Sequence, residues 1–228
     1  MQKAAAVVSV LLLAGACGLP RDPRHTLENV RAEHVLRVGV TDDPPFIVRT
    51  GDEANGLDAA LIRGFAAQLG ARVEWIWTAQ EEQFQALHRC QLDLMAGGFD
   101  EKTPWKKQVA LTRPFAEIRE AIGAPPLATV PDDLLGHEVT IREGDPAGEM
   151  LEKQKATIKS MRELGRGQGL VAAPRAELLR LGYVPQKTLM TRKLVFAVPQ
   201  GENAFLRRLE LYLAAHHAEF AHQAGEPE

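Results

Sequence analysis

Residues 35–46 read Val-Leu-Arg-Val-Gly-Val-Thr-Asp-Asp-Pro-Pro-Phe, and this stretch decides the fold class. Its first seven residues alternate in polarity and are rich in valine, which predicts a strand. The paired prolines end that strand because neither can donate a hydrogen bond to a ladder. A turn at Asn55-Gly56 follows. Apolar residues at helical spacing then predict a helix over Leu57–Leu69, which Gly70 ends.

The same kind of pattern continues downstream. Val73–Trp77 is a predicted strand, Glu81–Arg89 a short amphipathic helix and Leu92–Ala96 a third strand. This β-α-β-α-β order predicts an α/β fold with a parallel sheet and right-handed crossovers. Ligands of such sheets bind beyond the carboxyl ends of the strands. Those ends are Asp42–Phe46, Thr78 and Gly97–Lys102.

A second block of elements follows Thr112-Arg-Pro-Phe115. The pattern predicts strands at Arg119–Ala124, Glu138–Arg142, Leu170–Ala173 and Leu194–Val198, and helices at Glu149–Lys155, Ala176–Leu181 and 203–222. The sequence contains no internal repeat of fixed period.

Composition excludes several classes of protein. The chain has 228 residues, is 45% hydrophobic and 25% charged, and carries a formal net charge of −3. Without a basic block, nucleic acid is not an expected partner. Two cysteines cannot form a disulfide-stapled scaffold. His216, His217 and His222 lack the spacing typical of metal-binding helices, so we expect neither a metal nor a cofactor.

The N-terminus has the features of an export signal. Lys3 precedes an apolar run from Ala4 to Ala16, which is shorter than the roughly 20 residues that span a bilayer. Cys17 directly follows Leu-Ala-Gly-Ala, which resembles a bacterial lipobox, although Ala14 departs from its common leucine. The resemblance implies a signal peptide over 1–16 and a lipid on Cys17; the alternative is a secreted protein with an incidental cysteine. Pro- and charge-rich residues then predict a lipid anchor and tether over 17–34.

The order of these motifs resembles the bacterial extracellular solute-binding proteins of family 3, the amino-acid and polar-solute receptors of ABC importers. The matching segments are Leu36–Val40 with Pro44-Pro45-Phe46, Asn55–Asp58, Leu92–Gly98, Thr103–Trp105, Leu111–Phe115, Leu135–Val139 and Glu143-Gly144. The match is specific in the first half of the chain and weaker in the second.

The resemblance implies a two-lobed periplasmic-binding-protein fold of type II, with the lobes joined by two hinge strands and the ligand between them. Lobe one is then residues 35–115 plus 191–222, and a shortened lobe two is 116–190. It also implies a monomer in the periplasm, anchored to the lipid bilayer through acylated Cys17. Such a protein captures a small polar solute, an amino acid or related organic ion, for an ABC permease in the inner membrane.

Several ligand-binding residues follow from the resemblance in lobe one. Phe46 stands where the family stacks an aromatic ring on the ligand; the alternative is that it fills the core of lobe one. Gly98 and Phe99 follow a glycine turn whose backbone amides can approach a ligand closely. Thr103, Trp105 and Lys106 lie where amino-acid receptors carry an arginine that grips the ligand carboxylate.

The remaining site residues are less like the family pattern. Lysine lacks the planar fork of arginine, so Lys106 is either a point-charge substitute or a solvated residue. Trp105 lies either at the cleft or in the core, and Arg113 is a further cation for the cleft or an ordinary surface residue. Asp145 is the candidate in lobe two, because the late aspartate of the family is missing. Recognition of an α-amino acid is therefore left open.

Two alternatives to a binding protein remain. The same fold hosts a cyclohexadienyl dehydratase and, fused to another domain, peptidoglycan lyases, and fold does not fix function. Carboxylates at Asp100, Glu101, Glu143 and Asp145 could supply an acid–base pair. The chain has no G-x-S-x-G or H-E-x-x-H motif, so we expect no enzyme. A ligand-sensing module is the second alternative.

Overall fold

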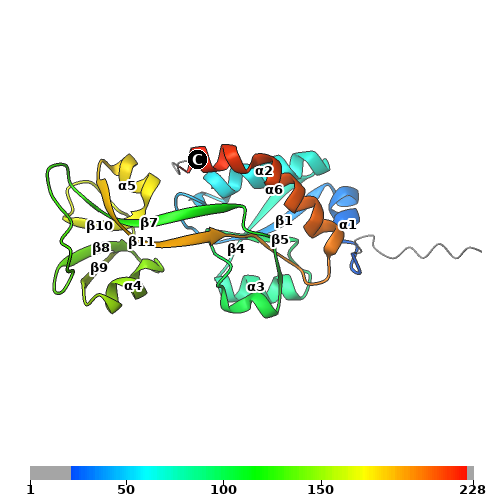
Figure 1. Ribbon diagram of the computed structural model, residues 1–228. Helices are drawn as coiled ribbons and strands as arrows, with labels where there is room; N and C mark the ends of the chain where they lie inside the picture. Colours follow the sequence, from blue (N-terminus) through cyan, green and yellow to red (C-terminus); the bar gives the residue numbers. More distant parts are fainter. Residues whose placement is uncertain (1–21, 225–228) are drawn as a thin grey trace, which may run out of the picture.

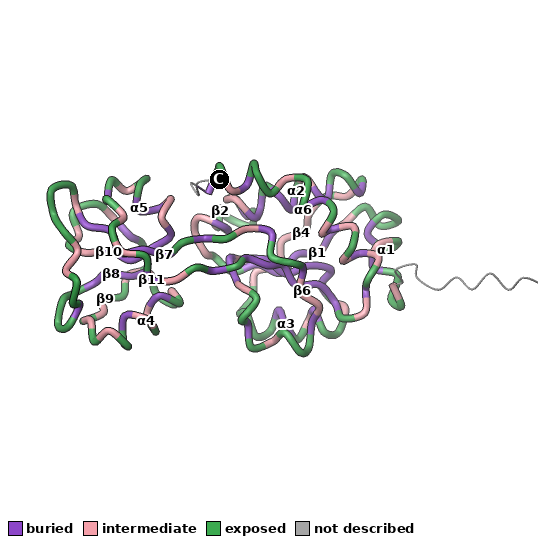
Figure 2. Tube along the Cα trace, viewed as in Figure 1, coloured by how far each residue is buried: buried purple, intermediate pink, exposed green. Residues whose placement is uncertain are grey.

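The computed structural model describes residues 22–224 of the chain. Figure 1 shows two α/β lobes joined by a pair of long strands, β7 (Ala116–Ala124) and β11 (Val184–Leu194). The fold class expected from the sequence is confirmed. Figure 2 shows that buried residues gather around the central strands of the lobes, while the outer loops and helix faces are exposed.

Lobe one is built on a five-stranded sheet in the order β4-β1-β5-β12-β6. Its strands are β1 (Val35–Val40), β4 (Arg72–Trp77), β5 (Leu94–Ala96), β6 (Ala110–Leu111) and β12 (Ala197–Val198). The first strand pairs in parallel with β4 and β5, whereas β12 runs antiparallel to β5 and β6. The predicted β-α-β-α-β unit is therefore confirmed, and the returning C-terminal segment completes the sheet.

Helices cover both faces of this sheet (Figure 1). The helices α2 (Leu57–Leu69) and α6 (Asn203–Gln223) pack on one face, where Phe65 contacts the rings of Phe205 and Tyr212 at centroid distances of 5.8 and 5.6 Å. The opposite face carries α3 (Gln80–His88) and the short 3-10 helix η1 (Pro104–Lys107). A hairpin of β2 (Val48–Thr50) and β3 (Glu53–Asn55) flanks the β1 loop.

Lobe two is built on a second five-stranded sheet in the order β11-β7-β10-β8-β9. Besides the two long strands it contains β8 (Glu138–Arg142), β9 (Thr157–Met161) and β10 (Leu170–Pro174), with the helices α4 (Ala147–Lys153) and α5 (Arg175–Leu181). The central strand β10 is antiparallel to β7 and parallel to β8. We retain the division into lobe one and lobe two at residues 115/116 and 190/191 as a proposal.

The long strands β7 and β11 form an antiparallel ribbon between the lobes. Their register runs from the Ala116–Leu194 pair at lobe one to the Ala124–Val184 pair at lobe two, with irregularities near Pro185 and Thr188. The sequence pattern did not predict most of β11, because its polar and apolar residues do not alternate regularly. Two paired strands therefore connect lobe one with lobe two.

The structure differs from the predicted tether over residues 22–33. Here helix α1 (Thr26–Glu33) packs on lobe one and buries Val30. Glu202 accepts hydrogen bonds from the backbone N–H groups of Arg24 (2.9 Å) and Thr26 (3.0 Å). The predicted tether is therefore wrong over residues 22–33, which are folded against lobe one. The predicted signal peptide and Cys17 lie outside the described residues. Among residues 22–224, no helix is long and apolar enough to cross a membrane.

Candidate functional site

A cavity of about 380 Å³ lies between the two lobes. Lobe one contributes the segments that follow the carboxyl ends of β1 and β5, and lobe two contributes the loop between β8 and α4. The residues that line this interlobe cleft are Thr41–Asp43, Gln80, Gly97–Asp100, Thr103, Pro104, Arg142–Pro146 and Arg192. Its position agrees with the strand ends singled out from the sequence, and its volume suits a small molecule.

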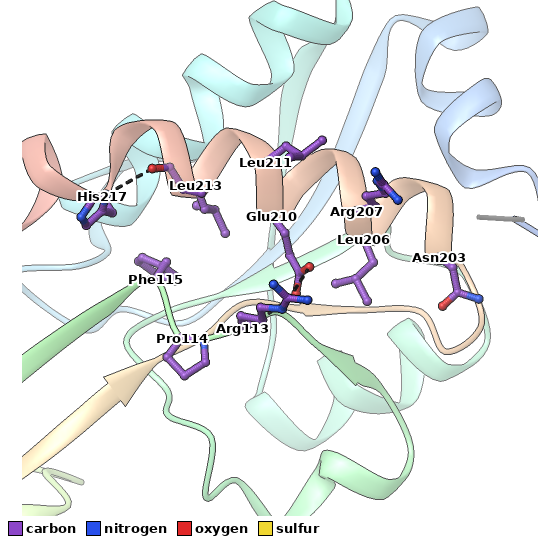
Figure 3. Close-up of a pocket in the computed structure, with 11 residues that line it drawn as sticks. Arg113, Pro114, Phe115, Asn203, Leu206, Arg207, Glu210, Leu211, Leu213 and His217 are labelled. Atoms are coloured by element: carbon purple, nitrogen blue, oxygen red, sulfur yellow. Dashed lines mark hydrogen bonds and ion pairs between the residues drawn. The ribbon is translucent and has the colours of Figure 1, made fainter. Parts of the chain in front are cut away.

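A larger hollow of about 760 Å³ lies on the outside of lobe one, between α6 and residues 113–115 (Figure 3). Arg113 lies here, with a side chain that is 90% exposed, and its backbone N–H donates to Glu210 Oε1 at 2.8 Å. All the residues that line this hollow belong to lobe one. The interlobe cleft is the stronger candidate because it draws side chains from both lobes.

A buried ion pair stands at the hinge side of the cleft. Arg192 on β11 lies with its Nη1 2.9 Å from Glu120 Oε1 on β7, and its Nη2 donates to the Gly98 carbonyl. Burial raises the pKa of Glu120, while the guanidinium of Arg192 counteracts that rise. This arginine therefore ties the hinge ribbon to the glycine turn of lobe one.

A second arginine joins the lobes across the cleft. Arg142, at the end of β8, lies with its Nη2 2.6 Å from the buried Glu177 on α5, and its Nη1 donates to the Pro44 carbonyl at 2.6 Å. Glu177 belongs to lobe two, whereas Pro44 belongs to the β1 loop of lobe one. The contact holds the β1 loop against lobe two.

The carboxyl groups around the glycine turn have raised pKa values. Burial raises the pKa of Asp43 to about 6, against the opposing charge of Arg192. Burial also raises the pKa of Asp58 to about 7, although Gly98 donates its backbone N–H to Asp58 Oδ2 at 3.2 Å. The pKa of Asp145 is raised by burial as well.

The cleft brings together four of the residues singled out from the sequence, namely Gly98, Phe99, Thr103 and Asp145. Four others lie elsewhere. Phe46 is 1% exposed and packs in the core of lobe one, with its ring centroid 6.0 Å from Arg192 Cζ. Trp105 stacks on Phe84 at 5.3 Å in the second core cluster of lobe one.

Lys106 is exposed on η1 and does not line the cleft, and Arg113 lies in the outer hollow. Neither of the two cations singled out from the sequence therefore reaches the cavity. The cations that do are Arg142 and Arg192. Asp43 could have been found, because it follows the first strand and stands directly before the prolines. Arg192 could not, because its strand carried no apolar alternation.

No group of three or more His, Cys, Asp or Glu residues within 22–224 is arranged to hold a metal ion.

Comparison with known proteins identifies relatives over most of the chain. The sequence profile of the bacterial extracellular solute-binding proteins, family 3, matches residues 36–219. Among curated proteins, membrane-bound lytic murein transglycosylase F of Ectopseudomonas mendocina is 30% identical over 162 residues, which cover 68% of this chain and 33% of that protein. The same enzyme of Vibrio campbellii is 33% identical over 103 residues, or 44% of this chain and 19% of that protein. The chain thus spans a third or less of the length of these relatives.

Solved structures share the fold. An ancestral cationic amino acid solute-binding protein matches with a TM-score of 0.75 and 20% identity, covering 87% of this chain and 98% of that one. A binding component of an ABC transporter from Wolinella succinogenes, complexed with lysine, matches with a TM-score of 0.68 and 18% identity, covering 83% and 95%. With the profile match over residues 36–219, these findings show that the chain belongs to the bacterial extracellular solute-binding proteins of family 3.

Proposed function

We propose that this protein captures a small polar solute in the interlobe cleft and delivers it to an ABC permease in the inner membrane. The observation that carries the proposal is a cavity of about 380 Å³ lined from both lobes, which are joined by a two-stranded ribbon. A solute that contacts both lobes binds the closed arrangement better than the open one, and so it shifts the population toward closure.

The proposed contacts with the solute come from the turns at the strand ends. Gly98, Phe99 and Thr103 line the lobe-one side, and Asp145 faces them from lobe two. Phe46 supports this side from the core, directly beneath Gly98, where an added methyl group would contact its ring. Lysine and cationic amino acids are named in the structures of similar fold, and the solute proposed here is an amino acid or related organic ion.

We assign the protein a receptor role rather than an enzymatic one. The lytic murein transglycosylases F match only with a third or less of their own length, so their activity is not attributed to this chain. Enzymes do share this fold, and one similar structure is described as the precursor of a cyclohexadienyl dehydratase. A receptor returns its solute unchanged, whereas a dehydratase or lyase consumes it.

A thermal-shift screen of the purified protein with amino acids, amines and organic acids tests the function. A true ligand at 100 times its Kd stabilises the native state by about 2.7 kcal/mol. Chromatography of the incubated ligand should recover all of it unchanged. A screen in which no polar solute stabilises the protein contradicts the receptor function, and steady consumption of a ligand favours the enzyme.

A matched pair of glycine variants places the ligand. Gly98 and Gly51 have similar positive φ angles, +63° and +64°, so alanine strains the backbone equally at both. At Gly98 the added methyl group would collide with Asp43 Oδ2 and Phe46, whereas at Gly51 it would meet open space. We expect Gly98→Ala to weaken binding at least tenfold and Gly51→Ala to leave it unchanged. Equal affinities would place the ligand outside the cleft.

The proposed location is the periplasm, with a monomeric protein anchored through a lipid on Cys17. Cleavage before Cys17 and acylation of its sulfur would attach the folded body to a bilayer through several acyl chains, as durable anchoring requires. Cells fed a clickable fatty acid should label the wild-type protein and not Cys17→Ala. Equal labelling of both proteins would argue for a secreted form without an anchor.

A further inference from the structure

The first described residues are bound to a fixed point on lobe one. Asp22 Oδ1 accepts two backbone N–H groups from the first turn of α6, at 2.7 and 3.0 Å, and its Oδ2 accepts one from α1 at 3.1 Å. Glu202, which directly precedes α6, is buried and accepts two backbone N–H groups from residues 24–26. These reciprocal hydrogen bonds hold the beginnings of α1 and α6 together, so the chain enters lobe one at a defined place.

This place lies at the edge of the lobe-one sheet that is opposite the interlobe cleft. The cleft follows the carboxyl ends of β1 and β5. Because β12 runs antiparallel to β5, the residues that follow β12, Glu202 among them, lie at the amino ends of β1 and β5. Figure 1 shows α1 at the end of the molecule that is farthest from lobe two. A partner can therefore contact this edge without covering the cleft.

Three exposed arginines lie along this edge. Arg72 begins β4 and donates its backbone N–H to the His34 carbonyl at 2.9 Å, where α1 leads into β1. Arg89 is the C-cap of α3, before β5. Burial raises the pKa of the adjacent Cys90 and the charge of Arg24 lowers it, so Arg24 lies nearby. Neighbouring strands are about 4.8 Å apart, so these arginines share one edge, which we call the basic edge.

The charges of the basic edge are not neutralised by ion pairs within residues 22–224. Of the two carboxylates on the adjacent α1, Glu33 pairs with Arg37 at 2.5 Å, and Glu28 contacts His25 at 3.0 Å. Glu74 lies two residues farther along β4, away from the edge. A positive edge on a chain whose formal net charge is −3 is complementary to an anionic surface.

The distance along the chain to the proposed lipid anchor is short. Cys17, outside the described residues, is five residues before Asp22, and a fully extended chain spans at most about 3.6 Å per residue. The fixed point on lobe one therefore cannot lie more than about 18 Å from a lipid-bearing Cys17. The attraction between exposed charges and an anionic surface acts over a Debye length of about 8–10 Å. A tether this short keeps the basic edge close to that range.

Building on the proposed lipid anchor, we propose that the basic edge of lobe one contacts the anionic phospholipid headgroups of the bilayer that holds the lipid on Cys17. A lipid chain and a basic surface together make membrane attachment more durable than either alone. Since the contact is made by lobe one, this lobe stays against the bilayer, and closure of the cleft moves lobe two.

Energy transfer to the bilayer tests the contact in the acylated protein, obtained by expressing the full chain and reconstituted in vesicles with an acceptor dye on a lipid headgroup. A donor dye is placed on the edge through Gln91→Cys or at the exposed end of lobe two through Leu127→Cys, each combined with Cys90→Ser. In vesicles of phosphatidylcholine and phosphatidylglycerol, we expect at least twofold higher transfer from residue 91 than from residue 127. Equal transfer from both positions would overturn the proposal.

Neutralising the edge tests its charge. Arg24→Gln, Arg72→Gln and Arg89→Gln, combined in one protein, should lower the transfer from residue 91 at least twofold. Vesicles of phosphatidylcholine alone, or a raised salt concentration, should have the same effect on the unmodified edge, because both weaken the attraction to the headgroups. Transfer that is indifferent to the arginines and to the anionic lipid would show that the edge does not contact headgroups.

A matched control removes the same number of exposed positive charges from lobe two. It combines Lys153→Gln, Arg162→Gln and Arg166→Gln. This protein should keep the transfer of the wild type, and thermal unfolding of both triple variants verifies that they fold. An equal loss of transfer in the control would mean that overall charge, and not the basic edge, governs the contact.

Failure of the anchor can be distinguished from failure of the receptor function. A protein that does not stay with the vesicles lacks the lipid on Cys17, and this result overturns the edge contact together with the anchor. The thermal-shift screen for a solute needs no membrane, so it decides the receptor function separately.

Discussion

Asp58, at the start of α2, is a fully buried carboxyl group with a pKa raised to about 7 by burial. The Gly98 and Gly97 backbone N–H groups and Arg192 lower that pKa, and Asp43 raises it. A carboxyl group whose pKa is higher in the folded protein than in the unfolded chain binds its proton more tightly when folded. The resulting stabilisation is present in acid and is lost as pH rises from about 4 through about 7.

We therefore expect the free energy of unfolding to fall between about pH 4 and about pH 7, by about 1.4 kcal/mol per unit of pKa difference. Asp58→Asn keeps an oxygen for the Gly98 N–H and removes the titration, so it should flatten this part of the profile. Urea denaturation at a series of pH values measures the free energy of unfolding of the variant and of the wild type. Asp43, Asp93 and Glu120 titrate in the same direction, so the comparison is the slope of the variant against the wild type. Identical slopes would show that Asp58 does not titrate there.

At the level of single residues, the sequence predicted part of the interlobe cleft. Gly98, Phe99, Thr103 and Asp145 were accessible because they follow elements whose ends are marked by glycine, proline or a change of periodicity. Arg192 was not, because its role depends on pairing with Glu120, 72 residues away along the chain. Lys106 shows the converse: this cation stands in the expected motif, yet on η1 it is exposed and does not line the cavity.

Among the elements, α3 ends at a strained residue. Its C-cap is Arg89, and Cys90 next to it has φ of +57°, in the left-handed region where a Cβ is unfavourable by about 1 kcal/mol. Cys90→Gly should raise the free energy of unfolding by about 0.5 kcal/mol, since glycine also gains freedom in the unfolded chain. Gly70, which ends α2 with φ of +73°, is the matched control, and Gly70→Ala should lower it by about 1 kcal/mol. A less stable Cys90→Gly variant would mean that the thiol's packing outweighs the strain.

Strongly patterned elements were predicted to within a few residues, whereas β9 and β11 were not. β9 reads Thr-Ile-Lys-Ser-Met at the edge of its sheet and buries little, so its strand conformation depends on pairing with β8. β11 contains Pro185 and a run of polar residues over 186–188, and its pairing partner β7 precedes it by about sixty residues. Local periodicity cannot report a strand whose stability comes from a distant partner.

For the whole molecule, Arg142 is the contact that holds the β1 loop of lobe one to lobe two. Lysine keeps a positive charge beside the buried Glu177, but its single nitrogen cannot reach both Glu177 and the Pro44 carbonyl as the fork does. We expect Arg142→Lys to increase the radius of gyration measured by small-angle X-ray scattering and to weaken ligand binding at least threefold. Arg162→Lys, at an exposed pair with Glu143 (3.7 Å), is the control and should change neither. An unchanged radius and affinity in Arg142→Lys would remove this contact from the closure mechanism.

The paired strands β7 and β11 also determine how the lobes can move (Figure 1). A ladder of backbone hydrogen bonds lets a two-stranded ribbon flex across its face, but bending it edgewise would stretch or break those bonds. The lobes are therefore expected to rotate relative to each other about a single hinge axis, because motion in other directions would strain the β7–β11 hydrogen bonds. A single donor–acceptor label pair spanning the cleft should then describe the whole motion, and every solute that acts on the protein should move its reading along the same line.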